Sequence, residues 1–488
     1  MEFDTVVRNG IIANASECIL GQDIGIKDGL IACIGIGLPV SASTSVIDAQ
    51  GGYITPGGVD SHVHLEQWNT PTGDTWETGT RSAVCGGTTT VLCFASQNQT
   101  DQSVLPVVED YLGLAKGRSA CDYGIHLILT NPTKEVVEKE LPLLVRYSGI
   151  TSVKLYMTYH PMKLGDREIL DIMVATRRLG ITTMVHAENH DMIELIIETL
   201  EQRGQVEPYY QAVSRPKIAE AEATYRAISL SELMDTPILL VHVSSELAAK
   251  HIRDAQTRML PIYGETCPQY LYLLSDRLRG ENFEGAKCVC SPPLRERPED
   301  TDAMWTSIAN GTFTTFSSDH AATKFYAEGG KRLGLINGRP VFAKIPNGLP
   351  GLETRLPLLF KGVEEGRITI QDFVRVASSN PAKLYGVTRK GAVLPGYDAD
   401  LCIWYPTGKL EPFVLKNSML HHDIDYTPFE DMTFTNWPRY TLLRGKMGWN
   451  RDDGGFIGKF GGGNYIKRTV SALAGPRNVF VNEWRPPI

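Results

Sequence analysis

The chain has 488 residues, of which 42% are hydrophobic and 21% are charged, and its formal net charge is −8. This composition is ordinary for a globular protein with a large core, and the negative charge argues against nucleic acid or an anionic membrane as the main partner. Nine cysteines without regular spacing do not resemble a disulfide framework. We expect a cytoplasmic protein, because the N-terminus lacks a signal peptide and the longest apolar runs are only strand-sized.

Both ends of the chain contain short β-rich runs separated by turns. Asn9-Gly10 and Asp28-Gly29 are hairpin signals flanked by alternating apolar residues, and a similar pattern returns in the last hundred residues. We expect residues 1–56 and 387–455 to pair as one β-sandwich domain. Residues 456–488 are rich in Gly and Pro and cannot form a core alone, so we expect an arm that could dock on a neighbouring subunit.

The middle of the chain, residues 57–386, alternates short β-rich runs with helix-length segments. This pattern is typical of repeated βα units and a parallel sheet. The runs are Gly57–Leu65, Gly87–Ala95, Tyr123–Thr130, Ile150–Met157, Ile181–Glu188, Pro237–Ser244, Met259–Thr266 and Phe313–His320. Eight such runs predict an α/β fold, a (β/α)8 TIM barrel whose active site lies at the C-terminal ends of its strands.

Ionisable side chains lie at the ends of five of these predicted strands. They are His62, His64, Lys154, His186, His242 and Asp319. Each has a structural explanation, because a strand histidine is more often a hydrogen-bonded core residue, a lysine can be a strand-edge charge and an aspartate can cap a helix. A barrel directs all of its strand ends to one rim, however, so the six side chains should converge. The set as a whole therefore indicates a metal site.

Lys154 is the unusual member of this set. A buried ammonium is costly and would repel a nearby metal ion. Its neutral amine can instead add carbon dioxide to become a carbamate, an anion with two oxygens that can bridge two divalent ions. Histidine and oxygen ligands suit zinc best, with manganese or iron as alternatives.

An ordered set of motifs in the chain resembles the dihydropyrimidinase/D-hydantoinase group of the cyclic amidohydrolases. The motifs include PGGVDSHVHLE, SVKLYMTY, MVHAEN, LVHVSS, CSPPLR, SSDHA, KIPNGLPGLETR and SSNPAKLYGV, and the resemblance covers about residues 3–465. It implies a TIM barrel with a β-sandwich from the two termini, usually in a homotetramer. It also implies that a metal-bridging hydroxide opens the ring of a 5,6-dihydropyrimidine or a 5-substituted hydantoin.

The resemblance further implies a binuclear zinc centre. One ion would be held by His62, His64 and Asp319. The other would be held by His186 and His242, and N6-carboxylated Lys154 would bridge both ions. Asp319 would also act as the base that takes a proton from the hydroxide and returns it to the leaving nitrogen.

Substrate residues are implied in the same way. Tyr159, five residues after Lys154, would donate a hydrogen bond to the developing oxyanion. Backbone groups at Ser291 and Asn347 would hold the ring amide and imide. The pocket for the exocyclic substituent would be formed by Leu65, Tyr156 and Lys163. There Lys163 would favour small or polar substituents, unless it points to solvent.

Two alternatives stay open. An allantoinase-like or dihydroorotase-like hydrolase of another cyclic imide or ureide is the first, although those enzymes generally lack the tyrosine found here at position 159. A non-catalytic, hydantoinase-like scaffold protein is the second, and the full ligand set argues against it. The chain departs from many family members at Ala321, where they have cysteine, and its segment between Asp319 and Asn347 looks a few residues longer.

Overall fold

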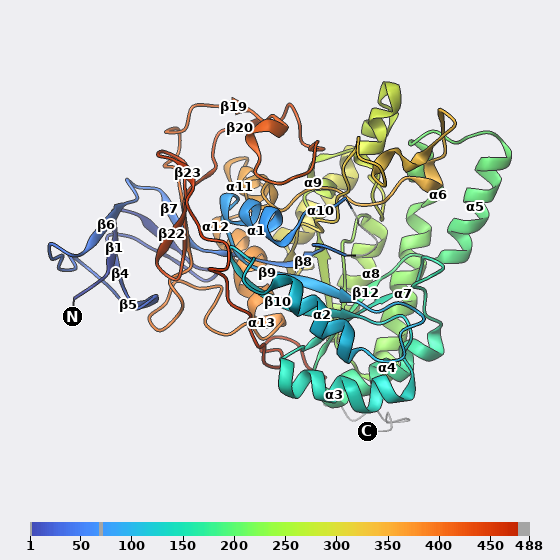
Figure 1. Cartoon of the computed structure of the whole chain (residues 1–488), viewed down its shortest axis with the longest axis horizontal. Helices are drawn as coiled ribbons and strands as arrows, with labels where there is room; N and C mark the ends of the chain where they lie inside the picture. The colour runs from blue at the N-terminus through green and yellow to red at the C-terminus, as the bar shows by residue number, and fades with distance from the viewer. Residues whose placement is uncertain (1, 68–71, 477–488) are drawn as a thin grey trace.

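An eight-stranded parallel sheet lies at the centre of the molecule in the computed structural model, which describes residues 2–67 and 72–476 (Figure 1). Its strands follow one another in chain order, and the sheet closes where Val63 pairs with His320. The strands are β8 (Gly58–Val63), β9 (Thr88–Ser96), β10 (Asp122–Ile128), β11 (Ser152–Tyr156), β12 (Thr182–His186), β13 (Ile238–Leu240), β14 (Ile262–Thr266) and β15 (Thr315–Phe316). Each predicted run overlaps one strand, so the predicted TIM barrel is confirmed.

Helices surround this barrel because their apolar faces pack on its outer side. In α4, the buried residues Ile169, Ile172, Met173 and Thr176 recur at helical spacing, and the helix ends at Gly180 with a φ of 65°. Among residues 2–67 and 72–476, no helix has the length and hydropathy that a bilayer crossing requires. The helices are α1 (Trp76–Cys85), α2 (Leu105–Ala115), α3 (Leu141–Leu143), α4 (Asp166–Leu179), α5 (His190–Gln202), α6 (Tyr210–Ser214), α7 (Lys217–Met234), α8 (Glu246–Thr257), α9 (Gln269–Tyr272), α10 (Pro298–Ala309), α11 (Arg355–Glu364), α12 (Ile370–Val374) and α13 (Asn380–Leu384).

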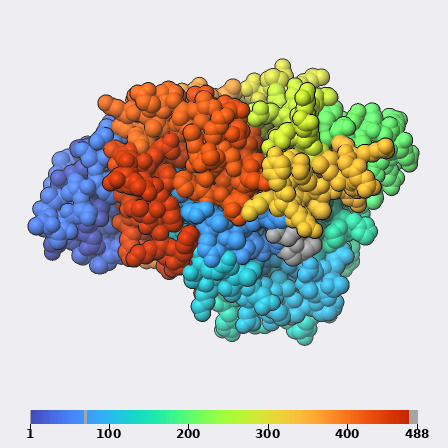
Figure 2. Space-filling model, turned by 45° about the horizontal axis from the view of Figure 1, so that its top comes forward, coloured from blue at the N-terminus to red at the C-terminus, as the bar shows by residue number. Residues whose placement is uncertain are grey.

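Strands from both ends of the chain form two further sheets beside the barrel, and Figure 2 shows these ends side by side. One sheet has the order β5-β4-β1-β6, and the other has the order β23-β22-β21-β18-β7-β2-β3. The two ends pair directly, because Ile54 of β7 lies opposite Ile403 of β18. The predicted pairing of the two chain ends is therefore confirmed, and these two sheets are called the second β-region below. Its bounds at 1–56 and 387–455 stay a prediction. Its strands are β1 (Thr5–Arg8), β2 (Ile11–Ala13), β3 (Cys18–Ile19), β4 (Asp23–Lys27), β5 (Leu30–Gly35), β6 (Ser45–Asp48), β7 (Tyr53–Pro56), β18 (Leu401–Trp404), β21 (Pro438–Leu443), β22 (Lys446–Asn450) and β23 (Gly455–Phe456).

Two further two-stranded sheets lie apart from these larger sheets. The strands β16 (Leu335–Ile336) and β17 (Arg339–Pro340) pair in the long segment after the last barrel strand. The strands β19 (Phe413–Val414) and β20 (Thr433–Phe434) pair near the C-terminal end of the chain.

The C-terminal segment after β23 runs across the N-terminal end of the same chain's barrel. The backbone of Asn464 accepts a hydrogen bond from Tyr123 (3.0 Å), and the backbone of Arg468 donates one to Gly149 (3.2 Å). The buried guanidinium of Arg468 donates to Ser152 Oγ (2.8 Å) and to the carbonyl of Ile125. The described part of the predicted arm thus docks on its own barrel, because Arg468 fills a polar site there. Residues 477–488 of that arm lie outside the described residues.

A buried charge cluster joins the second β-region to the base of the barrel. The Lys390 Nζ lies 2.6 Å from carboxylate oxygens of both Asp122 and Asp400, and 3.0 Å from one of Asp398. Asp122 begins β10, whereas Asp398 and Asp400 directly precede β18. Burial alone would lower the pKa of Lys390, but the three carboxylates outweigh it and raise that pKa well above its ordinary value. Lys390 is therefore held as an ammonium by this ion-pair network.

We expect Lys390→Met to lower the free energy of unfolding by about 3–5 kcal/mol, because three buried carboxylates would lose their shared cation. The loss should appear as a lower midpoint in urea and a lower Tm. The control is Arg389→Met, which removes an adjacent cation whose side chain is 61% exposed and should change stability by no more than about 0.5 kcal/mol. Equal losses in the two variants would contradict this assignment.

Candidate metal and substrate site

The six predicted ligand residues meet at the C-terminal rim of the barrel. His62, Lys154 and His186 lie within β8, β11 and β12. The other three follow strands directly: His64 after β8, His242 after β13 and Asp319 after β15. All six line one cavity of about 420 Å³, which is in the size range of small-molecule sites. The structure therefore brings the whole predicted ligand set together.

His62, His64 and Asp319 form one compact donor set. The Asp319 Oδ1 lies 3.1 Å from His62 Nε2 and 3.6 Å from His64 Nε2. One ligand atom from each residue lies within 4.8 Å of the others. Tetrahedral zinc ligands about 2.0–2.1 Å from the ion are separated by similar distances, so this donor set fits a single cation.

His186 and His242 form a second donor pair, with ring centroids 4.5 Å apart. The His242 Nδ1 is buried and has no hydrogen-bond partner among the described residues. A buried imidazole nitrogen without a partner is costly unless a ligand satisfies it. Since it lies in a cavity with other imidazoles, this atom fits coordination to a cation.

Lys154 lies between aromatic rings and imidazoles at the centre of the site. Its Nζ is 3.1 Å from His62 Nε2. The same atom lies 5.2 Å from the ring centroid of Phe94 and 5.2 Å from that of Tyr156. The side chain is fully buried, and burial lowers the pKa of Lys154 to about 8 although the charge of Asp319 opposes the shift. Near neutral pH, a much larger fraction of this amine is therefore neutral than for an exposed lysine.

Three polar side chains hold the outer nitrogens of the imidazoles. Glu265 Oε1 in β14 lies 2.7 Å from His62 Nδ1, and Gln67 Oε1 lies 2.6 Å from His64 Nδ1. Glu188 Oε2 lies 2.7 Å from His186 Nε2. Such partners fix the orientation of ligating histidines and their tautomers. None of these three residues was predicted from the sequence, although Glu265 is a strand-end carboxylate in a predicted barrel strand.

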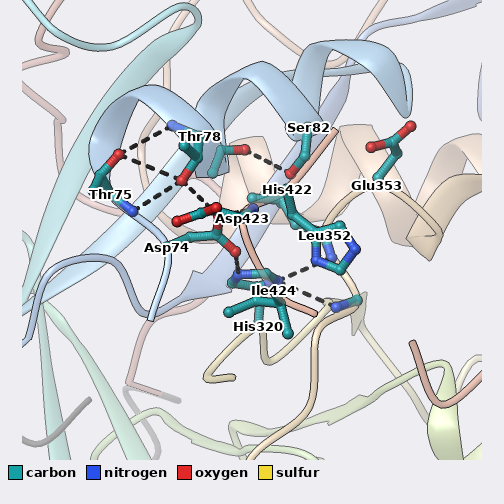
Figure 3. A network of polar contacts seen from close by, with 12 residues as sticks. Asp74, Thr75, Thr78, Ser82, His320, Leu352, Glu353, His422, Asp423 and Ile424 are labelled. Atoms are coloured by element: carbon teal, nitrogen blue, oxygen red, sulfur yellow. Dashed lines mark hydrogen bonds and ion pairs between the residues drawn. The ribbon is translucent and has the colours of Figure 1, made fainter. Parts of the chain in front are cut away.

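His320, which is not one of the predicted ligands, fixes the backbone next to Asp319 (Figure 3). Its Nε2 lies 3.0 Å from Asp74 Oδ2, and its Nδ1 accepts hydrogen bonds from the backbone amides of Gly351 (3.2 Å) and Leu352 (3.4 Å). Burial alone would raise the pKa of Asp74, but the His320 hydrogen bond and nearby imidazoles outweigh it and lower that pKa well below its usual value. An ionised Asp74 thus holds the loop that carries Asp319.

The backbone is strained at three residues of the site. Tyr159, His242 and Asp319 have φ angles of 68°, 40° and 46°, in the left-handed region that is uncommon for residues other than glycine. Each such residue costs about 1–3 kcal/mol and persists only where its surroundings impose it. The strain coincides with two of the ligand residues and the predicted oxyanion donor, as is typical of functional sites.

Four of the predicted substrate residues line the same cavity: Tyr156, Tyr159, Ser291 and Asn347. The Tyr159 ring lies 5.3 Å from the His186 ring, and burial raises the pKa of Tyr159 to about 12. Gln211 Nε2 donates to Asn347 Oδ1 (2.8 Å) and Ser291 Oγ (3.3 Å), so these two residues are held as a unit.

Leu65 and Lys163, by contrast, are not among the residues that line the cavity. Leu65 is fully buried against α1, where a Cβ on Gly79 would lie 2.4 Å from Leu65 Cδ2. The Lys163 Nζ lies 3.5 Å from Asp191, and the side chain is 38% exposed. Both the Met162 and Lys163 amides bond to the Tyr159 carbonyl, and this tight turn places Met162 in the cavity wall and Lys163 outside it.

Comparison with known proteins gives concordant matches along nearly the whole chain. Residues 53–448 match the amidohydrolase family. A D-hydantoinase of Ralstonia pickettii is 39% identical over 470 residues, which are 96% of this chain and 99% of that protein. A D-hydantoinase of Geobacillus stearothermophilus is 41% identical over 468 residues, 95% of this chain and 96% of that protein. The crystal structure of dihydropyrimidinase from Brevibacillus agri NCHU1002 has a TM-score of 0.90 at 36% identity, over 96% of this chain and 99% of that one.

We expect Glu265→Gln to weaken zinc binding about tenfold, because the substitution removes the carboxylate that orients His62 while it keeps the side-chain size. Zinc affinity would be measured by competition with a chromophoric chelator. The control Glu198→Gln lies on the exposed side of α5 and should bind zinc as the wild type does. Unchanged affinity in Glu265→Gln would show that His62 does not depend on this carboxylate.

Proposed function

This chain belongs to the amidohydrolase family, and we propose that it opens the ring amide of a 5-substituted hydantoin or a 5,6-dihydropyrimidine by hydrolysis. One observation carries the proposal: His62, His64, Lys154, His186, His242 and Asp319 share a single cavity with Tyr159. Relatives named D-hydantoinase that match nearly the whole chain support the choice of substrate class.

We further propose that the site holds two divalent ions, with zinc as the first candidate. His62, His64 and Asp319 would hold one ion, His186 and His242 would hold the other, and carboxylated Lys154 would bridge them. The low pKa of Lys154 and the unpartnered His242 Nδ1 support this assignment. When bound, such ions supply a water that is acidic enough to react near neutral pH and they polarise the substrate carbonyl.

Asp319 is the residue that moves the proton in this proposal. Its Oδ1 faces His62 and His64, and its side chain is 12% exposed in the cavity. From this position the carboxylate accepts a proton from the attacking water and returns it to the ring nitrogen that leaves. The strained φ of Asp319 and the buried His320–Asp74 contact hold the carboxylate in place.

Tyr159 acts as the hydrogen-bond donor to the oxyanion. Because its pKa is about 12, its phenol stays protonated and can donate at any pH near neutrality. The guanidinium of Arg215 lies 5.4 Å from the centre of the Tyr159 ring and 2.9 Å from Glu188, which in turn contacts His186. These contacts fix the phenol relative to the ligand imidazoles.

Different residues of the cavity would bind the ring and its substituent. Backbone groups at Ser291 and Asn347 would bind the ring amide and imide. Tyr156, Pro161 and Met162 also line the cavity and present apolar surface, whereas the predicted Lys163 does not line it. We therefore propose that an apolar 5-substituent is accepted.

A panel of cyclic amides should show turnover of 5-substituted hydantoins or 5,6-dihydrouracil by the metal-loaded protein, and slower turnover of dihydroorotate and allantoin. Treatment with EDTA should abolish activity, and added zinc or manganese should restore it. His62→Ala should be inactive on every substrate. Turnover that survives EDTA, or a protein inactive on the whole panel, would rule out the proposal.

We expect Tyr159→Phe to lower kcat about 10²–10³-fold, since it removes a donor to the developing oxyanion. The zinc content should stay unchanged, because the ring can still pack against His186. Tyr147→Phe removes the same hydroxyl from a side chain that is 58% exposed and serves as the matched control. A kcat within threefold of the wild type in Tyr159→Phe would exclude this role.

A further inference from the structure

Lys331 is a fully buried lysine that the reaction outlined above does not use. Its Nζ donates hydrogen bonds to the carbonyl oxygens of Val289 (2.8 Å), Pro346 (2.7 Å) and Gly348 (2.7 Å). Within residues 2–67 and 72–476, no carboxylate lies within 4.0 Å of this nitrogen. The charge is thus compensated by backbone carbonyls alone.

The three carbonyls belong to the two segments that carry Ser291 and Asn347. Val289 lies two residues before Ser291, while Pro346 and Gly348 flank Asn347. The segments also bond to each other directly, because the Gly348 amide donates to the Val289 carbonyl (3.1 Å). Lys331 does not itself line the cavity, so it holds both segments from outside the cavity wall.

The protonated amine matches this site better than any other form would. An ammonium has three N–H donors for the three carbonyls, whereas a neutral amine has two. Burial lowers the pKa of Lys331 to about 7, but hydrogen bonds from the charged form to three carbonyls favour the ammonium. An apolar side chain of the same length would leave all three carbonyls without this donor.

The backbone around Lys331 has little room to adjust. Gly348 has a φ of 118°, and a Cβ there would lie 2.3 Å from the Ala321 carbonyl oxygen. On the cavity side, Gln211 holds the side chains of Ser291 and Asn347. The two residues are therefore held through their side chains by Gln211 and through the adjacent backbone by Lys331.

We propose that Lys331 is a positioning residue, whose ammonium fixes the backbone of residues 289–291 and 346–348 in the geometry that binds the substrate ring. The inference rests on the proposed function, since that function makes these segments part of the binding site. Lys331 acts through backbone that binds the substrate and does not reach the ligand cluster. Its loss should therefore affect KM more than kcat.

Steady-state kinetics of Lys331→Met, Lys331→Gln and the control Lys344→Met test the proposal. Lys331→Met should raise KM at least tenfold and leave kcat within threefold of the wild type. Lys331→Gln keeps two N–H donors on a shorter side chain and should give an intermediate KM. Lys344 is an exposed lysine of the same segment, so its replacement should leave KM unchanged. An unchanged KM in Lys331→Met, or a loss confined to kcat, would overturn the proposal.

Hydrogen exchange of the metal-loaded proteins separates this inference from the proposed function, because it needs no substrate. Lys331→Met should exchange faster than the wild type in peptides that contain Gly348 and residues 286–293, while peptides from β8 and β11 stay protected. Unchanged exchange would overturn the proposal even if the substrate panel succeeds. Loss of protection throughout the barrel in both Lys331 variants would also overturn it, because Lys331 would then be a general stabilising residue.

Discussion

Burial of the Lys154 amine at the centre of the barrel is the constraint on which the rest of the site depends. As an ammonium, it would be fully buried with no carboxylate of the described chain in ion-pair range, and 3.1 Å from an imidazole nitrogen. That state is unfavourable, so burial lowers the pKa of Lys154 and makes the neutral amine, and its conversion to an anion, more accessible than for an exposed lysine. Around it, His62, His64 and His186 each have one nitrogen left for the cavity, because Glu265, Gln67 and Glu188 occupy the other.

The contacts that close the barrel also bring the residues of the site together. The segment just after the last strand pairs with the first strand through Val63 and His320, and the His64 amide donates to the His320 carbonyl (2.8 Å). The Ser318 amide donates to Asp60, whose other oxygen lies 3.3 Å from the buried guanidinium of Arg355. These contacts bring His62 and His64 next to Asp319, which is distant from them in sequence. A defect in closure would therefore be a defect in the donor set.

The barrel and the ligand set were predictable because each depends on a pattern local to one strand. A β-rich run with a histidine, lysine or aspartate at its end marks both the strand and its contribution to the rim. Residues that depend on contacts between distant segments carry no such pattern, as Lys331 shows. The Leu65 and Lys163 predictions depended on which way a side chain points within a tight turn or beside a helix, which sequence spacing does not determine. The homotetramer, the cytoplasmic location and the carboxylation of Lys154 stay predictions.

The pairing of Ile54 with Ile403 has a consequence for synthesis of the protein on the ribosome. Strand β7 leaves the ribosome early, but its partner β18 emerges only after the whole barrel has been translated. At typical translation rates of ~5–20 residues per second, β7 is without its partner β18 for about 20–70 s. During that time β7 can pair with β2 on one side, but its other edge stays unpaired, a state prone to association with other chains. The two-ended β-region therefore makes productive folding depend on full-length translation, and truncated products should be intrinsically prone to aggregate.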